Sequence, residues 1–233
     1  MNGNGDHAAS AGRGFEAERR DMVARQIRER GIRSARVLEA MEIAPRHLFV
    51  AADLVSRAYA DEPLPIGEGQ TISQPFMVAA MAEALLLNGS ERVLEVGCGS
   101  GYQAAVLSRL AREVIAIETR PALAALARER LESLGYANVT VEEGDGSAGW
   151  PRAAPYDAIL VTAAAPQVPQ PLVDQLAEGG RLVIPVGGSN HQELLLIVKR
   201  DGGTREQSLY SCRFVPLVGR YGWRQDARDA DQG

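Results

Sequence analysis

The sequence has few cysteines, no long apolar segment and no net positive charge, and each of these absences argues against a class of protein. Its 233 residues include two cysteines, Cys98 and Cys212, without CxxC spacing, so neither a disulfide scaffold nor a zinc site is expected. No apolar run approaches the roughly 20 residues of a membrane span. The formal net charge of −5 argues against a dedicated nucleic-acid binder. We therefore expect no metal, no nucleic-acid partner and no membrane partner.

The two ends of the chain differ in composition from the part between them. Residues 1–20 are rich in Gly, Ala and Asn and predict a disordered tail, and residues 224–233 predict a second, solvated tail. The N-terminal stretch has no apolar core of the kind that a secretory signal needs, so a cytoplasmic protein is expected. The remaining length suits one structural domain.

Residues 21–90 read as a helical segment packed on the main core. "DMVARQIRERG" predicts a helix that ends at Gly31, and "ARVLEAMEIA" predicts a second helix before Pro45. After one short helical piece, a loop punctuated by Pro and Gly leads to "TISQPFMVAAMAEALL". This last stretch permits two interpretations of Ser73: it caps the following helix, or it faces a ligand.

Residues 91–223 alternate between strands and helices, which is typical of βαβ units and a parallel sheet. The predicted strands are "RVLEV", "EVIAIE", "NVTVEEGDG", "YDAILVT" and "RLVIPVG", with "PQPLVDQLAEGG" as the last helix. Two further strand-like runs, "ELLLIVKR" and "EQSLYSCRFVPLV", are joined by the turn signal "DGGT". The predicted fold is α/β: a doubly wound, mostly parallel, Rossmann-like sheet with an antiparallel C-terminal strand pair and an N-terminal helical addition.

A Gly-rich turn follows the first strand of this sheet. In "EVGCGSG" the glycines Gly97, Gly99 and Gly101 follow the pattern G-x-G-x-G, one residue out of register with the dinucleotide fingerprint. Glycines at such a turn permit positive φ and let a ligand approach the backbone. Because open α/β sheets bind ligands at the carboxyl ends of their strands, we expect a ligand here.

Two downstream carboxylates strengthen that expectation. Glu118 ends the second strand, 23 residues after Glu95, where an acidic side chain reaches the ribose of a bound nucleoside. Asp145 follows the third strand at the same edge and can accept from an adenine amino group. A solvated loop carboxylate is the alternative for each residue taken singly. A Rossmann dehydrogenase, the main competing class, would require the other glycine register and gives no reason for Asp145.

Together these features resemble the class I S-adenosylmethionine-dependent methyltransferase core. The resemblance implies that Glu95 lies near the methionine end of the cofactor, that Glu118 binds the ribose, and that Asp145 lies by the adenine. The cofactor-binding residues that it assigns are Glu95, Gly97, Gly99, Gly101, Glu118, Asp145 and Gly146.

The residues outside the core favour a carboxylate as the methyl acceptor. "VTAAAP", residues 161–166, lacks the (Asn/Asp)-Pro-Pro-aromatic run of nucleobase amino methylases. None of His7, His47 and His191 lies in a Gly-rich turn or at a core strand end, so packing or solvated-loop roles are favoured for them. A carboxylate needs no catalytic base, because its reference pKa is about 3.9 and it is ionised at neutral pH. A site that positions the acceptor and excludes water suits that chemistry.

The sequence resembles the protein-L-isoaspartate (D-aspartate) O-methyltransferase family over roughly residues 21–223. The segments that carry the resemblance include "PRHLFV", "AYADEPLPIGEGQTISQPFMVAAM", "VLEVGCGSGYQAAVLS", "EGDGSAGWP", "YDAILVTAAAP", "GGRLVIPVG" and "FVPLVG". It implies transfer of a methyl group to the α-carboxylate of isoaspartyl residues in damaged proteins, followed by collapse of the ester to a succinimide. It leaves activity on D-aspartyl residues open.

The same resemblance assigns residues to the acceptor. Ser73 becomes the catalytic hydroxyl that contacts the acceptor carboxylate, and the substrate-binding residues are Ile72, Gln74, Ala164, Ala165, Pro166 and Val218. Two alternatives stay open: a related carboxyl methyltransferase that acts on one dedicated peptide, and a catalytically silent module that binds S-adenosylmethionine. We expect a monomer whose partners are isoaspartyl-containing proteins and peptides.

Overall fold

A seven-stranded sheet forms the centre of the protein, with strand order β5-β4-β3-β6-β7-β8-β9. The computed structural model describes residues 14–188 and 190–224. Strands β3 to β7 pair in parallel, whereas β7–β8 and β8–β9 are antiparallel, which confirms the predicted fold class. The strands are β3 (Arg92–Val96), β4 (Glu113–Glu118), β5 (Val139–Glu143), β6 (Tyr156–Val161), β7 (Leu176–Gly187), β8 (Gln192–Arg200) and β9 (Gly203–Cys212).

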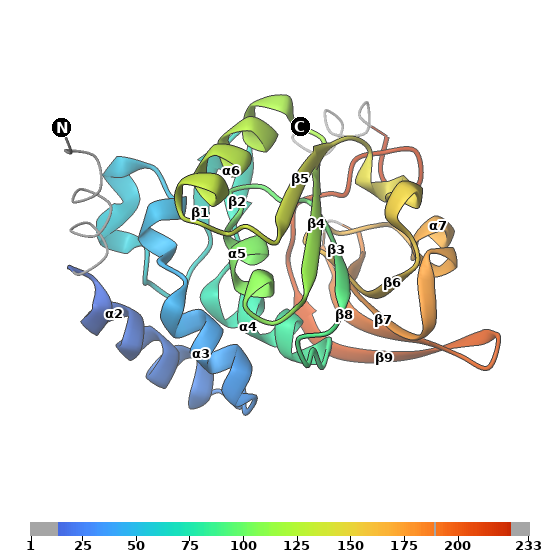
Figure 1. Ribbon diagram of the computed structural model, residues 1–233, viewed down its shortest axis with the longest axis horizontal. Helices are drawn as coiled ribbons and strands as arrows, with labels where there is room; N and C mark the ends of the chain where they lie inside the picture. The colour runs from blue at the N-terminus through green and yellow to red at the C-terminus, as the bar shows by residue number, and fades with distance from the viewer. Residues whose placement is uncertain (1–13, 189, 225–233) are drawn as a thin grey trace.

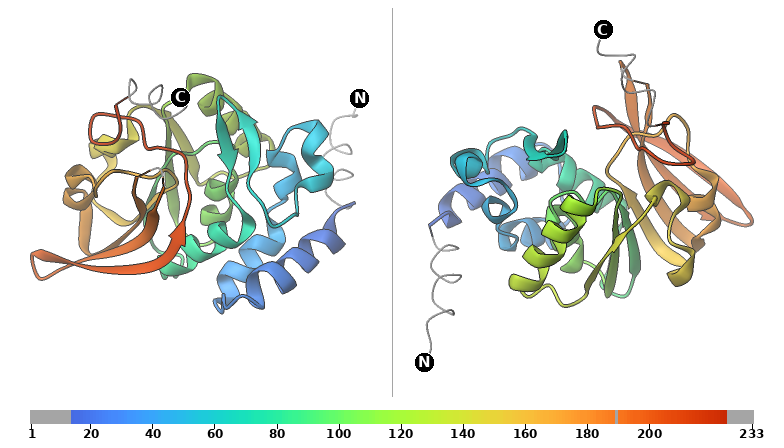
Figure 2. Two further views of the ribbon diagram at one scale, coloured as in Figure 1. Left: turned by 180° about the vertical axis from the view of Figure 1, so that it is seen from behind. Right: turned by 90° about the horizontal axis from the view of Figure 1, so that it is seen from above.

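Helices cover both faces of this sheet (Figures 1 and 2). The side chains of β3 alternate, so Val93 faces a core shared with the N-terminal helices, while Leu94 faces a second core on the other side of the sheet. The helices are α2 (Glu16–Asp21), a π-helix (Met22–Arg28), α3 (Ala35–Ile43), 3₁₀ turns (Arg46–Phe49, Ala52–Arg57, Gly146–Ala148, Pro151–Ala153), α4 (Pro75–Ala84), α5 (Tyr102–Ser108), α6 (Pro121–Ser133) and α7 (Gln170–Asp174).

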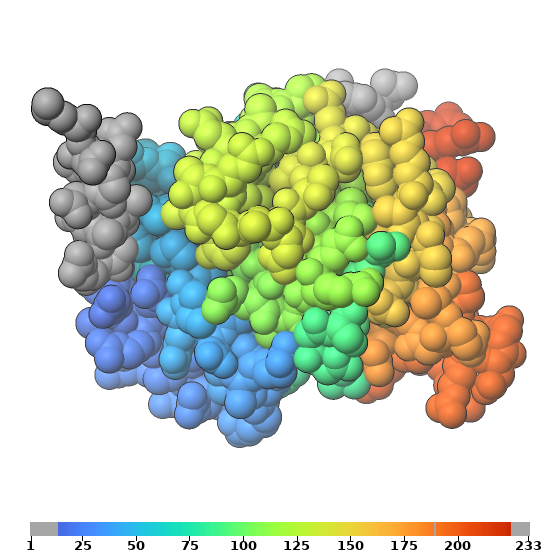
Figure 3. Space-filling model, viewed as in Figure 1, coloured from blue at the N-terminus to red at the C-terminus, as the bar shows by residue number. Residues whose placement is uncertain are grey.

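The N-terminal helices share one continuous hydrophobic core with α4, α5 and the sheet. On the face seen in Figure 3, the blue N-terminal segment packs against the green part of the chain without a gap. Arg46 strengthens this junction: its side chain is fully buried, lies over the ring of Tyr102 at 5.1 Å and donates to the carbonyl of Ala58 at 2.7 Å. Burial lowers the pKa of Arg46 to about 10, so the guanidinium remains charged at neutral pH.

The N-terminal segment differs from the sequence prediction in two places. The first helix begins at Glu16, inside the stretch predicted to be a disordered tail, and its second half is a π-helix that precedes Gly31. Residues 1–13 and 225–233, where the two tails are predicted, lie outside the described residues. The Pro- and Gly-punctuated loop contains a two-stranded hairpin, β1 (Leu64–Gly67) and β2 (Gln70–Ile72), whose two turn residues, Glu68 and Gly69, both have the positive φ that such a tight turn requires.

The last predicted helix is also shorter than its sequence pattern. Helix α7 ends at Asp174, and the "LAEGG" stretch forms the start of β7 instead. The amine of Lys199 on β8 donates to the carbonyl oxygens of Val173 at 3.1 Å, Asp174 at 3.2 Å and Leu176 at 2.8 Å. Carbonyls that end a helix lack partners within it, so this cation stabilises the early termination.

The C-terminal hairpin follows the prediction up to its final residues. Asp201 and Gly202 both have positive φ, as a two-residue hairpin turn requires. Strand β9 ends at Cys212, whereas the prediction continued it to residue 218. The following segment leaves the sheet edge and returns over the carboxyl ends of the parallel strands, where the backbone N–H of Leu217 donates to the carbonyl of Ala164 at 2.8 Å.

No helix in the described part of the chain is long and apolar enough to cross a membrane.

Candidate active site

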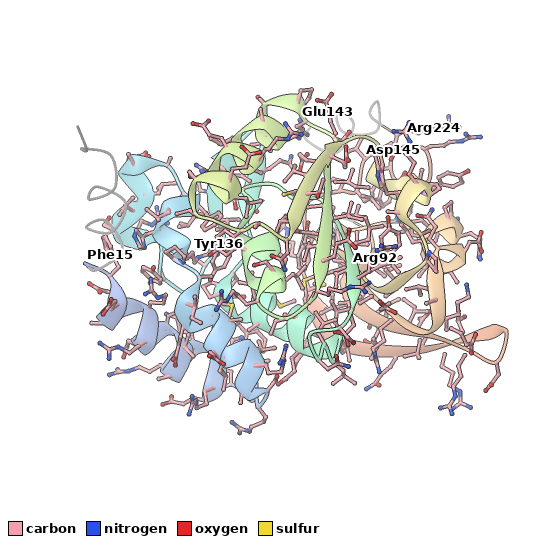
Figure 4. The ribbon with its side chains drawn as sticks, viewed as in Figure 1. Phe15, Arg92, Tyr136, Glu143, Asp145 and Arg224 are labelled. Carbon is pink, nitrogen blue, oxygen red and sulfur yellow. The ribbon has the colours of Figure 1, made fainter. Side chains whose placement is uncertain are left out.

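The Gly-rich turn lies where β3 ends, at the carboxyl edge of the parallel strands. Figure 4 marks the two ends of the sheet: Arg92 begins β3, and Glu143 and Asp145 lie at and beyond the end of β5 on the opposite edge. The backbone N–H groups of Gly97 and Cys98 both donate to the carbonyl of Ile117 on β4, at 2.8 and 2.9 Å. Hydrogen bonds to the neighbouring strand β4 therefore hold the turn in place.

The three glycines of the turn have different surroundings. Gly97 has φ +90°, and a Cβ there would lie 2.5 Å from the hydroxyl oxygen of Thr162. Gly99 has φ +55° and would meet Ile66 at 3.2 Å. Both line a cleft above the sheet. Gly101 does not line this cleft: its position faces Leu131 of α6 at 3.3 Å, so its small size lets the helices pack.

Glu118 lines the same cleft and also holds its glycine turn. One carboxylate oxygen accepts from the backbone N–H of Gly99 at 2.8 Å, and the other accepts from that of Arg120 at 3.0 Å. Each carboxylate oxygen has further lone pairs, so the side chain can also accept hydrogen bonds from a ligand's hydroxyl groups. Its place at the end of β4 is the one that the sequence predicts for a ribose-binding residue.

Glu95 lies behind the turn and is fully buried. Neither of its carboxylate oxygens has a hydrogen-bond partner among the described residues. Burial, and to a lesser extent the charge of Glu118, raises the pKa of Glu95 well above its ordinary value. Glu95 does not line the cleft, and its raised pKa favours the uncharged carboxyl form.

Asp145 has a different environment from the one its motif suggests. Its carboxylate accepts from the backbone N–H of Ser147 at 2.9 Å, from the Ser147 hydroxyl at 2.6 Å, and from the backbone N–H of Arg220 at 2.7 Å. It is exposed and is not part of the cleft wall, whereas its neighbour Gly146 is. A Cβ on Gly146 would lie 2.5 Å from Val96, so glycine lets this wall approach β3 closely.

We call this space the cofactor cleft; its further walls come from segments far apart in the sequence. It is bounded by the β1–β2 hairpin, the ends of β3, β4 and β6, and the C-terminal segment that leaves β9. Its lining residues are Gln70, Thr71, Val96, Gly97, Gly99, Ile117, Glu118, Thr119, Arg120, Gly146, Thr162, Ala163, Val215, Pro216, Leu217 and Val218.

A second space, which we call the acceptor cleft, adjoins the first. It is lined by Arg30, Pro63, Thr71, Ser73, Gln74, Phe76, Met77, Thr162, Tyr210, Ser211, Cys212, Arg213, Phe214 and Val215. Three of these residues, Thr71, Thr162 and Val215, line both clefts. The two spaces therefore meet at a common boundary.

Helix α4 begins in the acceptor cleft. Its N-cap is Gln74, and no side chain caps it, so Ser73 does not serve the capping role that one interpretation gave it. The hydroxyl of Ser73 makes no hydrogen bond to any residue within the described ranges and is half-buried in the cleft wall. The first turn of α4 leaves backbone N–H groups without intrahelical partners, and such a helix end favours an anion.

The other predicted acceptor residues are distributed unevenly. Gln74 lines the acceptor cleft and donates to the carbonyl of Asp61 at 3.1 Å, whereas Ile72 is buried and lines neither cleft. Ala164 and Ala165 are fully buried and Pro166 is exposed, and none of the three lines either cleft. Val218 lines the cofactor cleft rather than the acceptor cleft.

The residues that the sequence interpretation missed include the whole boundary between the clefts. Thr162 directly follows β6 and could have been found as the polar residue at a strand end. Thr71 lies two residues before Ser73 in a stretch already singled out. The family resemblance brings Val218 of the segment after β9 to the site, whereas no local signal singles out Val215.

The two histidines within the described residues lie outside both clefts. His47 is buried, with its Nδ1 2.7 Å from the hydroxyl of Tyr59. His191 is exposed, 3.5 Å from Glu193. His7 lies outside the described residues. Among those residues, no group of three or more His, Cys, Asp or Glu side chains is arranged to hold a metal ion.

Comparison with known proteins agrees with this geometry. The profile that describes the protein-L-isoaspartate(D-aspartate) O-methyltransferase family matches residues 17–222. The chain belongs to this family. Protein-L-isoaspartate O-methyltransferase 1 of Syntrophobacter fumaroxidans is 54% identical over 209 residues, covering 90% of this chain and 98% of that protein. The corresponding protein of Roseiflexus castenholzii is 59% identical over 210 residues, covering 90% and 95%.

Solved structures of the protein-L-isoaspartate O-methyltransferase family share the architecture. One matches with a TM-score of 0.80 at 32% identity, covering 87% of this chain and 67% of that chain. Another, from Plasmodium falciparum and in complex with S-adenosyl-L-homocysteine, matches with a TM-score of 0.75 at 27% identity, covering 86% and 98%.

The family uses S-adenosylmethionine as its cofactor, and the residues of the cofactor cleft fit it. The glycines at 97 and 99 expose backbone where a Cβ would protrude, and Glu118 offers acceptor oxygens. Glu118 adds its carboxyl oxygens at the cleft wall, and both oxygens of the buried Glu95 lack a hydrogen-bond partner among the described residues. These acceptor oxygens suit a ligand that carries an ammonium and a sulfonium group.

Proposed function

We propose that this protein transfers a methyl group from S-adenosylmethionine to the α-carboxylate of L-isoaspartyl residues in damaged proteins. The observation that carries the proposal is the acceptor cleft: Ser73 and the N-terminus of α4 open into it, and it meets the cofactor cleft at Thr71, Thr162 and Val215. A carboxylate that enters this cleft meets a free hydroxyl donor and a helix N-terminus, both of which favour an anion.

The chemistry requires position more than proton transfer. Bound S-adenosylmethionine supplies an electrophilic methyl group on a sulfonium. The acceptor carboxylate is ionised at neutral pH, so the chain needs no general base. Ser73 and α4 orient the carboxylate, Glu118 and the glycine turn hold the cofactor, and the apolar walls at Val215 and Leu217 limit water. Because two opposite charges are neutralised during transfer, a water-poor site favours the reaction.

The product of this reaction is a methyl ester on a protein. Attack by the neighbouring backbone nitrogen on the ester carbonyl forms a succinimide and releases methanol, and the backbone N–H supplies the proton. Water then opens the ring, in one direction to a normal aspartyl residue. This sequence makes methylation the first step of repair, and it needs no further residue of this chain.

The proposal also covers the cellular location and the oligomeric state of the protein. We propose that the protein works in the cytoplasm as a monomer on isoaspartyl-containing proteins and peptides, without nucleic acid or membrane as partners. Both cysteines are free, as is usual in a reducing compartment. One chain supplies the walls of both clefts, so no second copy is needed to complete the site. The division into segments 21–90 and 91–223 remains part of this proposal.

A matched set of peptides tests the function. The protein is incubated with methyl-labelled S-adenosylmethionine and three peptides that differ only in an L-isoaspartyl, a D-aspartyl or an L-aspartyl residue. Base-labile label on the isoaspartyl peptide and not on the aspartyl one is the expected result. Equal labelling of both, or none on either, would contradict it. Absence of label with tight binding of S-adenosylhomocysteine would instead support a silent binding module.

A further inference from the structure

The boundary between the two clefts includes one side chain that also holds the Gly-rich turn. Thr162 lines both clefts and directly follows β6. Its backbone N–H donates to the carbonyl of Val96 at 2.9 Å. Its hydroxyl lies 2.5 Å from the carbonyl oxygen of Gly97 and 3.1 Å from that of Val96. Thr162 thus fixes the turn from the side of β6.

The hydroxyl of Thr162 is committed to this structural contact. A hydroxyl has one hydrogen to donate, and the shorter distance assigns it to the Gly97 carbonyl. The same oxygen lies 2.5 Å from the point that a Cβ on Gly97 would occupy, so the threonine packs directly on the glycine. Ser73, by contrast, keeps a hydroxyl without a partner among the described residues. The hydroxyls of Thr162 and Ser73 therefore have different tasks.

We propose that Thr162 is a positioning residue for methyl transfer. Its hydroxyl sets the conformation of the turn at Gly97, and this fixes how the cofactor is presented to the acceptor cleft. The proposal rests on the proposed function, because presentation has meaning only if the acceptor cleft receives the substrate. Thr162 acts through Gly97 and not by contact with the reacting atoms.

The competing interpretation is that Thr162 only stabilises the end of β6. That role would change the free energy of unfolding and leave binding and turnover unchanged well below the melting temperature. A positioning role acts on the folded protein: it weakens cofactor binding, lowers kcat at saturation, and leaves the KM for the peptide nearly unchanged. The two interpretations therefore differ in measurements that stability alone does not move.

Three variants separate these interpretations. Thr162→Val keeps the shape of the side chain and removes the hydroxyl, whereas Thr162→Ser keeps the hydroxyl and removes the methyl group. Thr140→Val is the control, because Thr140 is exposed on β5 and lines neither cleft. For each protein, calorimetry gives the Kd for S-adenosylhomocysteine, steady-state assays give kcat and peptide KM, and thermal melts report the fold.

For Thr162→Val we expect the Kd to rise by about five- to tenfold, which is the range for one lost hydrogen bond, and kcat to fall by about tenfold. Peptide KM should stay within about twofold, and Thr162→Ser and Thr140→Val should behave like the wild type. Unchanged Kd and kcat in Thr162→Val would overturn the proposal, as would equal impairment in Thr162→Ser. If the wild type methylates no isoaspartyl peptide, the proposed function fails, yet the Kd comparison still tests the contact.

Discussion

The carboxylate of Asp145 accepts a hydrogen bond from the backbone N–H of Arg220, which lies 75 residues further along the chain, at 2.7 Å. The hydroxyl of Ser147 accepts from the neighbouring N–H of Tyr221 at 2.9 Å. Gly219 lies against the Asp145 carboxylate, where a Cβ would clash. These contacts anchor the segment that carries Val218 and the other C-terminal residues along one wall of the cofactor cleft.

This anchor predicts the behaviour of Ser147→Ala. Loss of the hydroxyl removes the acceptor for Tyr221 and one donor to Asp145, so the C-terminal segment should open more often. We expect the Kd for S-adenosylhomocysteine to rise by about fivefold, as for one lost hydrogen bond. Trypsin should also cleave faster after Arg220. Ser133→Ala, which removes a hydroxyl on the exposed surface of α6, serves as the control. Unchanged cleavage and affinity in Ser147→Ala would show that the anchor is dispensable.

Ser73→Ala tests the acceptor site. Because Ser73 caps no helix, its removal should leave the melting temperature nearly unchanged while kcat/KM for the isoaspartyl peptide falls by roughly 10- to 100-fold, the effect of losing a hydrogen bond to a charged group. The Kd for S-adenosylhomocysteine should barely change. Ser34→Ala is a matched comparison, because Ser34 does cap α3 through the N–H of Val37. It should lose about 1 kcal/mol of stability and keep its activity. The same pattern in both variants would refute this assignment.

Glu118→Ala should mainly weaken binding of the cofactor. It removes acceptors for two backbone N–H groups and for a bound ligand, so we expect the Kd for S-adenosylhomocysteine to rise at least about tenfold, while peptide KM changes little. Glu143→Ala is the control, since Glu143 pairs with Glu118 on the adjacent strand but is exposed and outside the cleft. Equal loss of affinity in the two variants would mean that general acidity, and not the position of Glu118, matters.

Glu95 makes stability depend on pH. Its pKa in the folded protein is raised, chiefly by burial, above the unfolded value of about 4.3. The contribution of Glu95 to the free energy of unfolding is therefore fully present below the unfolded pKa. It is lost as the pH rises toward the pKa of the folded protein. Glu95→Gln abolishes the titration, so the apo variant should gain stability relative to wild type between pH 5 and pH 8, by about 2–4 °C in Tm per kcal/mol. Melting curves across this range measure it, and a constant difference at every pH would falsify the assignment.

The sequence predicts much of the fold because its strongest signals are local. The alternation of short apolar strands with helices identifies the parallel sheet, and "EVIAIE" coincides with β4 at both ends. The boundary of α7 is missed because a distant side chain, Lys199, and the pairing of β7 decide it. The start of the first helix is missed because Glu16 follows a Gly- and Ala-rich stretch that hides it.

The site residues also differ in whether a local sequence signal predicts them. Gly97, Gly99 and Glu118 line the cofactor cleft, and motifs predict them because each lies at or just after the end of a predicted strand. The contacts of Asp145 are not, since they involve a segment 75 residues away. The family resemblance assigns Ala164 and Ala165 to the acceptor, but in the structure both backbones pair with later segments and both side chains are buried.

The amine that terminates α7 has a consequence for labelling chemistry. Lys199 is the sole lysine in the chain, since every other basic side chain apart from histidine is an arginine. Reagents that acylate amines therefore have one side-chain target here, and its nitrogen already donates to three carbonyl oxygens. The rate at which an activated ester modifies that nitrogen reports how often the junction between α7 and β7 opens. This measurement uses a native side chain and needs no engineered probe.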